Sequence, residues 1–200
     1  MNYIEIKEEA KELTSKYIFS FWKGALLVFA SSLVLSIILA IVANGILAVI
    51  TEILLLPLYI GLTSYILGIT RKEDVSFTRI FSGYKKIGLI VVTLIISYIL
   101  CMFGYFIFII PGIILTYSFA MISYLLADTK ETNIDKTGCI VKQSMKMMDG
   151  YKMDYFTFQL SFIGWYFLGI ITLGIAYIYV IPYFTFANTL YYQRLKEKLK

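Results

Sequence analysis

Three long stretches of the chain are almost free of charged residues. Residues 24–70 contain one charged side chain, Glu52, and residues 87–127 and 155–193 contain none. A helix crosses the hydrocarbon core of a bilayer with about 20 apolar residues, so each stretch is long enough for about two crossings. Backbone polar groups in lipid must bond to one another, which favours helices. The sequence therefore predicts an all-α membrane protein, a single polytopic domain over residues 1–200, with six transmembrane helices in three hairpins.

The positive charges indicate how the predicted hairpins are oriented in the membrane. All 18 Lys and Arg residues lie outside the three stretches, in four groups within residues 1–23, 71–86, 130–152 and 194–200. If each stretch is a hairpin, the four groups share one side of the membrane, and the positive-inside rule places that side in the cytoplasm. We expect the N- and C-termini to be cytoplasmic. We also expect the basic tail 194–200 to attract anionic lipid at the cytoplasmic face. Nucleic acid is not expected as a partner, because the basic residues are mixed with acidic ones.

Glu52 is the one charge inside a stretch. It is either an ion or substrate ligand, or a carboxylate at the outer rim of the first hairpin, near a turn at Asn44–Gly45. We favour the rim, since charges deep in a bilayer are costly. The later turns are expected near Gly104, or instead at Pro111–Gly112, and near Gly174.

A six-residue pattern precedes each stretch, which predicts a threefold internal repeat with units 1–70, 71–129 and 130–193. The pattern is two apolar residues, a short polar one, any residue, an aromatic and a lysine, and it occupies residues 18–23, 80–85 and 147–152. Each copy closes an amphipathic stretch, which we expect to be a cytoplasmic helix. Asn133 and Gly150 are expected to bracket the third helix, and Ser76 and Gly83 the second. The alternative is that membrane entry selects aromatic–lysine pairs independently each time.

The apolar faces and membrane-entry anchors of these helices follow from the spacing. The first helix is expected to bury Ile6, Ala10, Leu13 and Tyr17, and the third Ile134, Val141, Met145 and Met148. The six predicted anchors are residues suited to the membrane interface: Trp22, Lys23, Tyr84, Lys85, Tyr151 and Lys152.

Each of the three prolines is followed seven residues later by a hydroxyl. The pairs are Pro57 with Ser64, Pro111 with Ser118, and Pro182 with Thr189. A proline inside a helix frees a carbonyl and kinks the helix. The kinks either expose carbonyls to a substrate, as in transporters, or are closed by the hydroxyl, and the sequence leaves both open.

Further candidates lie in the third stretch. Gln159 and Asn188 either line a cavity or make interhelical hydrogen bonds, and Trp165 either forms the floor of a pocket or fills the core. The predicted binding residues are Pro111, Ser118, Gln159, Trp165, Asn188, Ser64 and Thr189. No catalytic residue, metal site or cofactor is predicted, because the chain has no histidine and no paired acids inside a stretch. The two cysteines, Cys101 and Cys139, do not predict a disulfide framework.

Several motifs resemble one family. They are Ile110–Ile114, Tyr117–Ser118, Leu125–Asp128, Ser144–Lys152, and above all Gln159–Trp165 continuing through Thr172–Ile175 to Ile181–Tyr183. Together they resemble the bacterial integral membrane protein family called domain of unknown function 975, over nearly the whole chain and most closely from Pro111 to Tyr192. Asp149 departs from the pattern, where a lysine often stands. The resemblance implies a multi-pass protein of the bacterial cell membrane and implies no reaction.

Two classes of function remain. The first is transport or binding of a small or amphipathic solute. The alternative is a membrane assembly, regulatory or peptide-protection protein that acts through its cytoplasmic amphipathic helices on a partner the sequence does not identify. A continuous polar cavity between the hairpins would favour the first, and a solid core with an apolar groove on the cytoplasmic helices the second. An enzyme ranks last.

Overall fold

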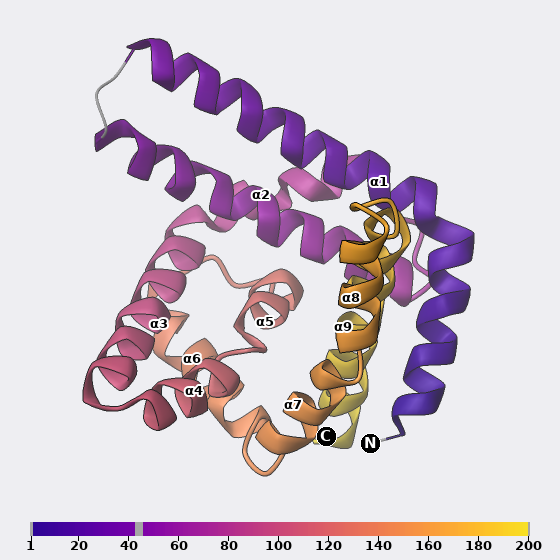
Figure 1. The fold of residues 1–200 in the computed structure, drawn as a ribbon. Coiled ribbons are helices and arrows are strands. Elements are labelled where there is room, and N and C mark those ends of the chain that lie inside the picture. The colour runs from indigo at the N-terminus through magenta and orange to yellow at the C-terminus, as the bar shows by residue number, and fades with distance from the viewer. Residues whose placement is uncertain (1, 43–45, 200) are drawn as a thin grey trace.

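The computed structural model describes residues 2–42 and 46–199, with side chains for residues 2–37 and 53–199. Within these residues the chain is helical and contains no strand, which confirms the all-α prediction. The elements are α1 (Tyr3–Val42), α2 (Ile46–Thr70), the 3₁₀ helix η1 (Phe77–Lys86), α3 (Ile87–Ile107), α4 (Ile109–Ser118), α5 (Ile122–Asp128), the short 3₁₀ helix η2 (Ile134–Lys136), α6 (Thr137–Met147), α7 (Lys152–Leu160), α8 (Ile163–Ile171) and α9 (Tyr177–Lys198) (Figure 1).

Four helical segments of the described chain are long and apolar enough to cross a membrane. They are Tyr3–Ile37, Ile53–Thr70, Phe77–Ile107 and Ile109–Asp128, all from the first two charge-poor stretches and their flanks. In the third stretch the helix is interrupted at Ser161 and Phe162, and α9 carries Asn188 and Gln193 among its tyrosines. The third stretch therefore supplies no single long apolar helix, although it is free of charge.

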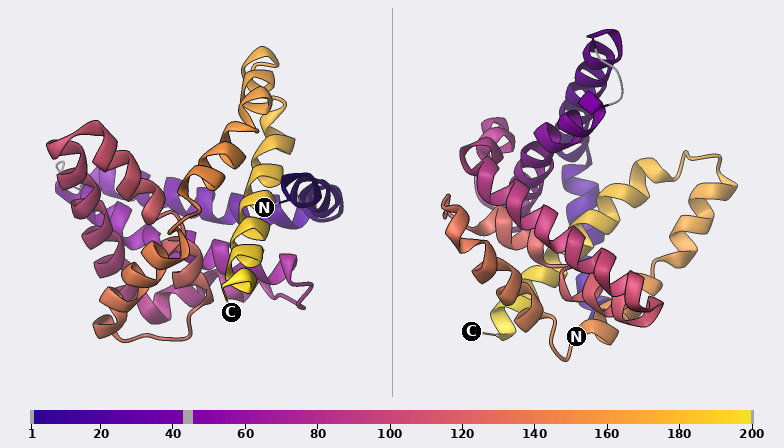
Figure 2. Two further views of the ribbon diagram at one scale, coloured as in Figure 1. Left: turned by 90° about the horizontal axis from the view of Figure 1, so that it is seen from below. Right: turned by 90° about the vertical axis from the view of Figure 1, so that its left-hand side faces the viewer.

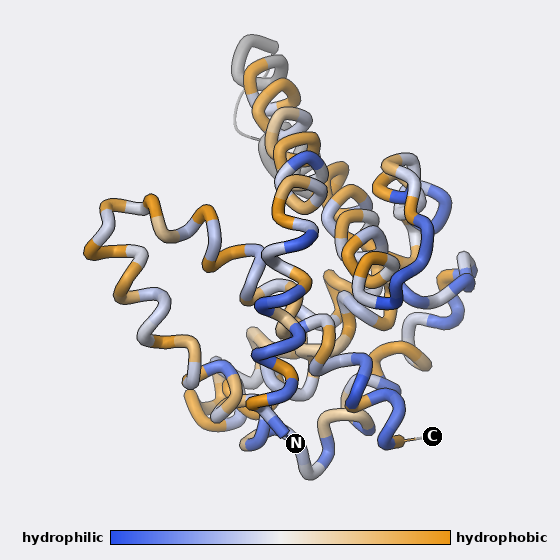
Figure 3. Tube along the Cα trace, turned by 90° about the vertical axis from the view of Figure 1, so that its right-hand side faces the viewer, coloured by the Kyte–Doolittle hydropathy of each residue, from blue (hydrophilic) through white to orange (hydrophobic). Residues whose placement is uncertain are grey.

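Three helix pairs project in different directions from a shared region of the molecule. The pairs are the second half of α1 with α2, α3 with α4, and α8 with the start of α9 (Figures 1 and 2). We call these pairs the arms. We call the region formed by the first half of α1, η1, α5, α6, α7 and the second half of α9 the base. The arms expose large apolar side chains, including Phe106 (89% exposed) and Leu173 (94%) near their ends. Hydrophilic positions gather near the two chain termini at the base (Figure 3).

The turns of the arms agree in part with the predicted positions. Leu173 and Gly174 have φ values of 51° and 94°, so the third turn lies at Gly174 as predicted. The second turn is at Phe108, between the two sites predicted for it. Gly104 instead packs against Gly112, where a Cβ on Gly104 would lie 3.1 Å from the Gly112 Cα. The predicted turn at Asn44–Gly45 and the side chain of Glu52 lie outside the described residues.

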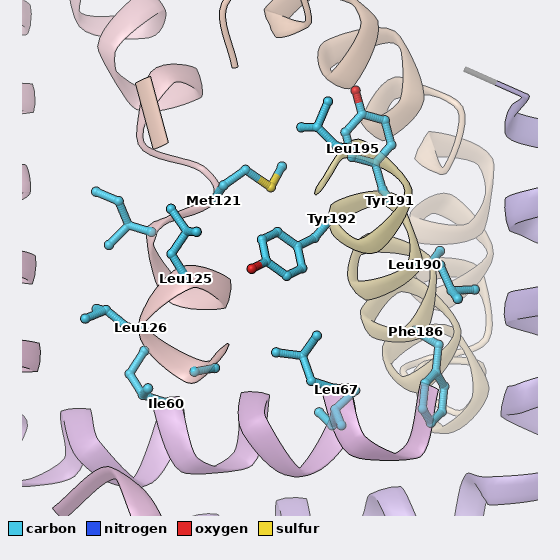
Figure 4. Packing of buried hydrophobic residues seen from close by; sticks show 14 of the residues in the cluster. Ile60, Leu67, Met121, Leu125, Leu126, Phe186, Leu190, Tyr191, Tyr192 and Leu195 are labelled. Carbon is cyan, nitrogen blue, oxygen red and sulfur yellow. The ribbon is translucent and has the colours of Figure 1, made fainter. Parts of the chain in front are cut away.

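In the base, the first half of α1 runs antiparallel to α9. Ile6, Ala10 and Leu13 are buried, as the spacing predicted. Arg194 on α9 pairs with Glu5 (2.7 Å) and Glu9 (3.0 Å) on α1. Side chains of α2, α5 and α9 meet in the core, where Met121 and Tyr192 point toward one another (Figure 4). α9 is therefore enclosed by α1, α2 and α5 over its second half.

The predicted cytoplasmic helices form, with corrections. Ser76 caps η1 as predicted, but η1 continues past Gly83 to Lys86 and leads into α3. Asn133 caps η2 through the Asp135 backbone N–H, and Gly150 with φ of 74° lies in the turn after α6. The predicted buried face of this segment is partly wrong, because Ile134 (47%) and Met145 (42%) are exposed. Val141 and Met148 are buried as predicted. Ile134 lies in η2, outside α6, and the buried face of α6 is Thr137, Ile140, Val141, Ser144 and Met147, to which Met145 does not belong.

Candidate anion-binding cavity

The 3₁₀ helix η1 crosses α2 in direct backbone contact. A Cβ on Gly83 would lie 1.9 Å from the Pro57 carbonyl oxygen, and a Cβ on Gly61 would lie 1.6 Å from the Ile80 carbonyl oxygen. Real Cβ atoms do not approach an oxygen this closely, so both positions require glycine. These contacts set the register of η1 on α2 and leave the other two faces of η1 with only side-chain bonds to α2, from Arg79 to Ser64 and from Tyr84 to the Leu54 carbonyl.

Those faces follow from the geometry of a 3₁₀ helix, in which residues three apart lie one above the other. Residues Ile80, Gly83 and Lys86 form the buried stripe. The second stripe is Arg79, Ser82 and Lys85, which we call the basic stripe. The third is Thr78, Phe81 and Tyr84, which we call the aromatic stripe; Phe81 is 48% and Tyr84 41% exposed.

A cavity of about 480 Å³ lies beside the basic stripe. Its other walls are the end of α2, the loop after α2, the end of α5 and the loop after α5. The charged residues that line it are the cations Arg71, Arg79, Lys85, Lys86 and Lys130 and the carboxylates Glu73 and Asp128. Cations outnumber carboxylates, so the cavity favours an anion.

Hydrogen bonds and ion pairs fix most of these charges. Arg79 donates from Nε to Ser64 Oγ (3.1 Å) and pairs with Glu73. Arg71 pairs with Asp128 at 2.7 Å, and this hydrogen bond raises the pKa of the Arg71 guanidinium despite partial burial. Both arginines are thereby held in place at the cavity wall.

The three lysines differ in their partners. Lys86 is 8% exposed and donates to the carbonyls of Leu126 and Thr129 (2.8 Å), which satisfies acceptors at the end of α5. Within the described part of the chain, Lys85 and Lys130 make no hydrogen bond or ion pair with another side chain, and both are exposed. These two ammonium groups are available to a bound anion.

Asp128 joins this cavity to a smaller one. Its carboxylate also accepts a hydrogen bond from Tyr192 (3.1 Å) and pairs with Lys196 on α9. The second cavity, of about 320 Å³, has Arg71, Asp128, Gln193, Lys196 and Glu197 in its walls. Asp128 therefore ties the ends of α2, α5 and α9 together.

The three predicted hydroxyl partners of the prolines have different roles. Ser64 lies in the cavity wall, where it accepts the hydrogen bond from Arg79. Ser118 donates to the Ile114 carbonyl (2.7 Å) and Thr189 to the Thr185 carbonyl (2.8 Å), four residues back in their own helices. Two of the three hydroxyls thus bond within their own helices, and Ser64 is the one that lines a cavity described for this chain.

The prolines also differ. Pro57 and Pro182 lie inside α2 and α9. Pro111 lies in the first turn of α4, where no intrahelical N–H bond is expected. The prediction that Pro111 kinks a helix is therefore wrong, because proline fits a first turn without breaking a bond.

The polar candidates of the third stretch meet around one tyrosine. Asn188 is buried, accepts a hydrogen bond from Tyr155 OH (2.7 Å) and donates to the Phe184 carbonyl (2.8 Å). Gln159 lies beside the same phenol. Trp165 is half-buried against the rings of Tyr179 and Tyr183. The four cavities described for this chain are lined by none of Pro111, Ser118, Gln159, Trp165, Asn188 and Thr189.

The predicted anchors connect segments of the protein. Trp22 donates from Nε1 to the Ile178 carbonyl (2.9 Å), and Tyr84 donates to the Leu54 carbonyl (3.1 Å). The Lys198 ammonium lies 5.1 Å from the centre of the Tyr151 ring. Of their lysine neighbours, Lys23 is exposed, Lys152 is half-buried and Lys85 lines the cavity.

Residues 105–199 match the model of a family described as protein of unknown function (DUF975). The predicted family resemblance is thereby confirmed. No curated protein and no solved structure matches the chain. The region matched to DUF975 includes Asp128 and Lys130 on the cavity wall, whereas α2 and η1 precede it. Among the described residues no three or more His, Cys, Asp or Glu side chains are grouped to hold a metal ion.

The basic and aromatic stripes of η1 were not predicted from the sequence. Their signal is a period of three, with Arg79, Ser82 and Lys85 in one row and Thr78, Phe81 and Tyr84 in the next. A search for apolar residues at the α-helical period of 3.6 does not separate the two stripes, because it assigns residues of both to one helix face. Arg71 and Asp128, 57 positions apart, gave no signal that they would meet.

Proposed function

We propose that this chain is a multi-pass membrane protein that binds an anionic solute in the cavity beside η1, at its cytoplasmic face. The observation that carries this proposal is the charge of the cavity wall, where five cationic side chains face two carboxylates. Both carboxylates are already paired with arginines. A partly enclosed site strengthens charge interactions relative to bulk water.

Binding is better supported than passage through the membrane. The hydroxyls of Ser118 and Thr189 bond to their own helices, and Asn188 accepts a hydrogen bond from Tyr155 and donates one to the Phe184 carbonyl. These groups therefore offer a solute few free hydrogen-bonding positions. We propose no chemistry on the bound solute, because Glu73 and Asp128 are held in ion pairs and the chain lacks histidine.

Action through exposed cytoplasmic helices has less support. The first half of α1 buries Ile6, Ala10 and Leu13 inside the base, and α6 buries Ile140 and Val141. Most of the apolar face that would bind a protein partner is thus already covered within the chain.

We further propose six crossings of a bacterial cell membrane, two for each arm, with both termini in the cytoplasm. The exposed apolar side chains of the arms support this, as does the absence of Lys and Arg from all three charge-poor stretches. The fifth crossing would combine α8 with the charge-free part of α7, residues 155–160, with the break at Ser161 and Phe162 inside it. In this topology the cavity and the four basic groups lie on the cytoplasmic side.

Binding can be tested by thermal unfolding of the detergent-purified protein with inorganic pyrophosphate, against sodium chloride at matched ionic strength. A ligand that binds the folded state raises the unfolding midpoint according to its concentration relative to Kd. We expect pyrophosphate to raise the midpoint of the wild type and to lose most of this effect in Lys85→Gln. Lys142→Gln, which removes an exposed lysine on α6 outside the cavity, should respond like the wild type. Equal shifts in all three proteins, or with chloride, would refute the proposal.

A further inference from the structure

An apolar groove lies at the membrane-facing end of η1. Its volume is about 500 Å³ and its walls are the second half of α1, Leu55 of α2 and Tyr84 of the aromatic stripe. The α1 wall includes Leu27, Ala30 and Val34, and the hydroxyl of Ser31 is already bonded to the Leu27 carbonyl (2.8 Å). The groove is therefore suited to a hydrocarbon chain, and it lies on an arm whose sides are apolar.

A third cavity lies on the outer side of η1, beside the basic and aromatic stripes, and Asp74 is the carboxylate in its wall. It has a volume of about 500 Å³ and shares Arg79, Ser82 and Lys85 with the anion-binding cavity, while Phe81 of the aromatic stripe forms another part of its wall. Phe81 and Tyr84 are one turn apart on the same stripe. Around η1 the walls thus change from cationic on the basic stripe, at Arg79 and Lys85, to aromatic on the neighbouring stripe, at Phe81 and Tyr84.

We infer that the bound solute is an anionic lipid, with its phosphate on the basic stripe and one acyl chain lying past Phe81 and Tyr84 in the groove between α1 and α2. This inference rests on the proposed function, since it identifies the class of solute for the same site. A soluble phosphate compound would use only the cationic part and would leave the aromatic stripe and the groove without a role.

The two adjoining stripes explain why one ligand would occupy both parts. In a 3₁₀ helix, neighbouring stripes are a third of a turn apart, so a headgroup on one and a chain along the next need no rearrangement of the protein. Each further methylene of the acyl chain that is removed from water strengthens binding. The headgroup selects by charge, and the groove adds affinity that grows with chain length.

Native mass spectrometry of the full chain in detergent tests this inference with three probes. Dioleoyl phosphatidic acid has the charge and the long chains, dihexanoyl phosphatidic acid has the same headgroup on short chains, and dioleoyl phosphatidylcholine has the long chains without net charge. We expect one dioleoyl phosphatidic acid per chain, bound at least about tenfold more tightly than either other probe.

Two variants separate the parts of the site. Ala30→Trp fills the groove and should reduce binding of dioleoyl phosphatidic acid about tenfold while leaving dihexanoyl phosphatidic acid unchanged. Ile99→Trp, at an exposed position of α3 away from the groove, is the matched control. Lys85→Gln should weaken both phosphatidic acids. Retained binding of the short-chain probe and an unchanged unfolding midpoint would show that Ala30→Trp is folded.

The outcomes distinguish this inference from the proposed function. If Ala30→Trp and Ile99→Trp bind the long-chain anionic lipid as well as the wild type does, the groove assignment is overturned while anion binding stands. If Lys85→Gln changes no probe, both fail. Equal binding of phosphatidylcholine would reduce the site to ordinary lipid contact and would also overturn the inference.

Discussion

Residues 80–85 and 147–152 share one sequence pattern and adopt different structures. The first of these two copies, residues 80–85, lies in the continuous 3₁₀ helix η1, whereas the second, residues 147–152, ends α6, turns, and starts α7. Gly83 is needed for space, because the Pro57 carbonyl occupies the place of its side chain. Gly150 is needed for its φ of 74°, and a Cβ there would meet nothing within 4 Å. The same glycine in the same pattern therefore has two unrelated physical causes.

The next residue along each copy differs as well. Lys86 is buried and bonded to the end of α5, while its counterpart Met153 is 73% exposed. The glycine and the residue after the pattern are thus fixed by contacts with α2 and α5 in residues 80–86, whereas in residues 147–153 the glycine serves the turn and the following residue is exposed. Substitutions at Gly83 and Lys86 should therefore lower the free energy of unfolding more than substitutions at Gly150 and Met153.

Gly83→Ala should have the largest effect. A methyl group against the Pro57 carbonyl forces η1 away from α2, and overpacking of this kind costs about 3 kcal/mol. Thermal unfolding in detergent would show a lower midpoint. Gly138→Ala, in α6 with open space around the new Cβ, is the control and should be neutral or slightly stabilising. If Gly83→Ala unfolds at the same temperature as the wild type, close packing against the Pro57 carbonyl is not the reason for glycine at this position.

Lys86→Met should come second. It removes a charged donor from the Leu126 and Thr129 carbonyls, and hydrogen bonds to charged groups contribute about 1.5–3 kcal/mol. Met153→Ala should change the unfolding free energy by less than about 0.5 kcal/mol, as expected for an exposed position. Equal effects of the two substitutions in denaturant titrations would contradict the assignment of Lys86 as a link to α5.

Gly150→Ala should cost about 1 kcal/mol, because only the left-handed backbone opposes a side chain there. Gly150→Asn should cost less, since asparagine tolerates this conformation better. If alanine and asparagine are equally destabilising, strain at φ is not the cause, and the turn at Gly150 needs another explanation.

The smallest effect is expected at Asp154, two residues after the second of these copies. Its carboxylate accepts hydrogen bonds from Tyr3 and Tyr191 (2.9 Å). Burial acts to raise the pKa of Asp154, but the bonds from Tyr3 and Tyr191 outweigh it and hold the pKa below its ordinary value of 3.8. A lowered folded-state pKa gives stability that is present above 3.8 and lost as the pH falls through the lower value.

Asp154→Asn should therefore unfold a few degrees below the wild type at neutral pH. The difference should shrink as the pH falls below about 4, where the wild-type carboxylate becomes protonated. The midpoints of both proteins, measured from pH 7 down to pH 3, give the comparison. If the difference between the two unfolding midpoints stays constant over this pH range, the negative charge of Asp154 does not contribute to stability.

The features predicted from sequence are those with local causes. Charge-poor stretches predicted helices, Ser76 and Asn133 were correctly predicted as caps, and Gly174 as a turn. Each of these depends on a residue and its immediate neighbours. Burial of Ile6, Ala10 and Leu13 also followed from a simple helical period.

The features that were missed depend on contacts between distant residues. A 3₁₀ helix as long as η1 is uncommon, and it rests on close contacts of Gly83 with Pro57 and of Gly61 with Ile80. The cavity wall likewise combines Arg71 with Asp128. Nothing local to either residue encodes that pairing, so the cavity could be found only in the folded chain.

We propose that the arms cross the membrane, together with the apolar parts of α5 and α7 that continue them, and that the charged part of the base lies in the cytoplasm. Single cysteines in a chain without Cys101 and Cys139, labelled in intact cells with a membrane-impermeant maleimide, test it most directly. Leu173→Cys at the end of the third arm should react, and Lys142→Cys in the base should react only after permeabilisation. Labelling of Lys142→Cys in intact cells would reverse the orientation. Protection of Leu173→Cys from the impermeant reagent, with reaction to a permeant one, would show that the third arm does not cross.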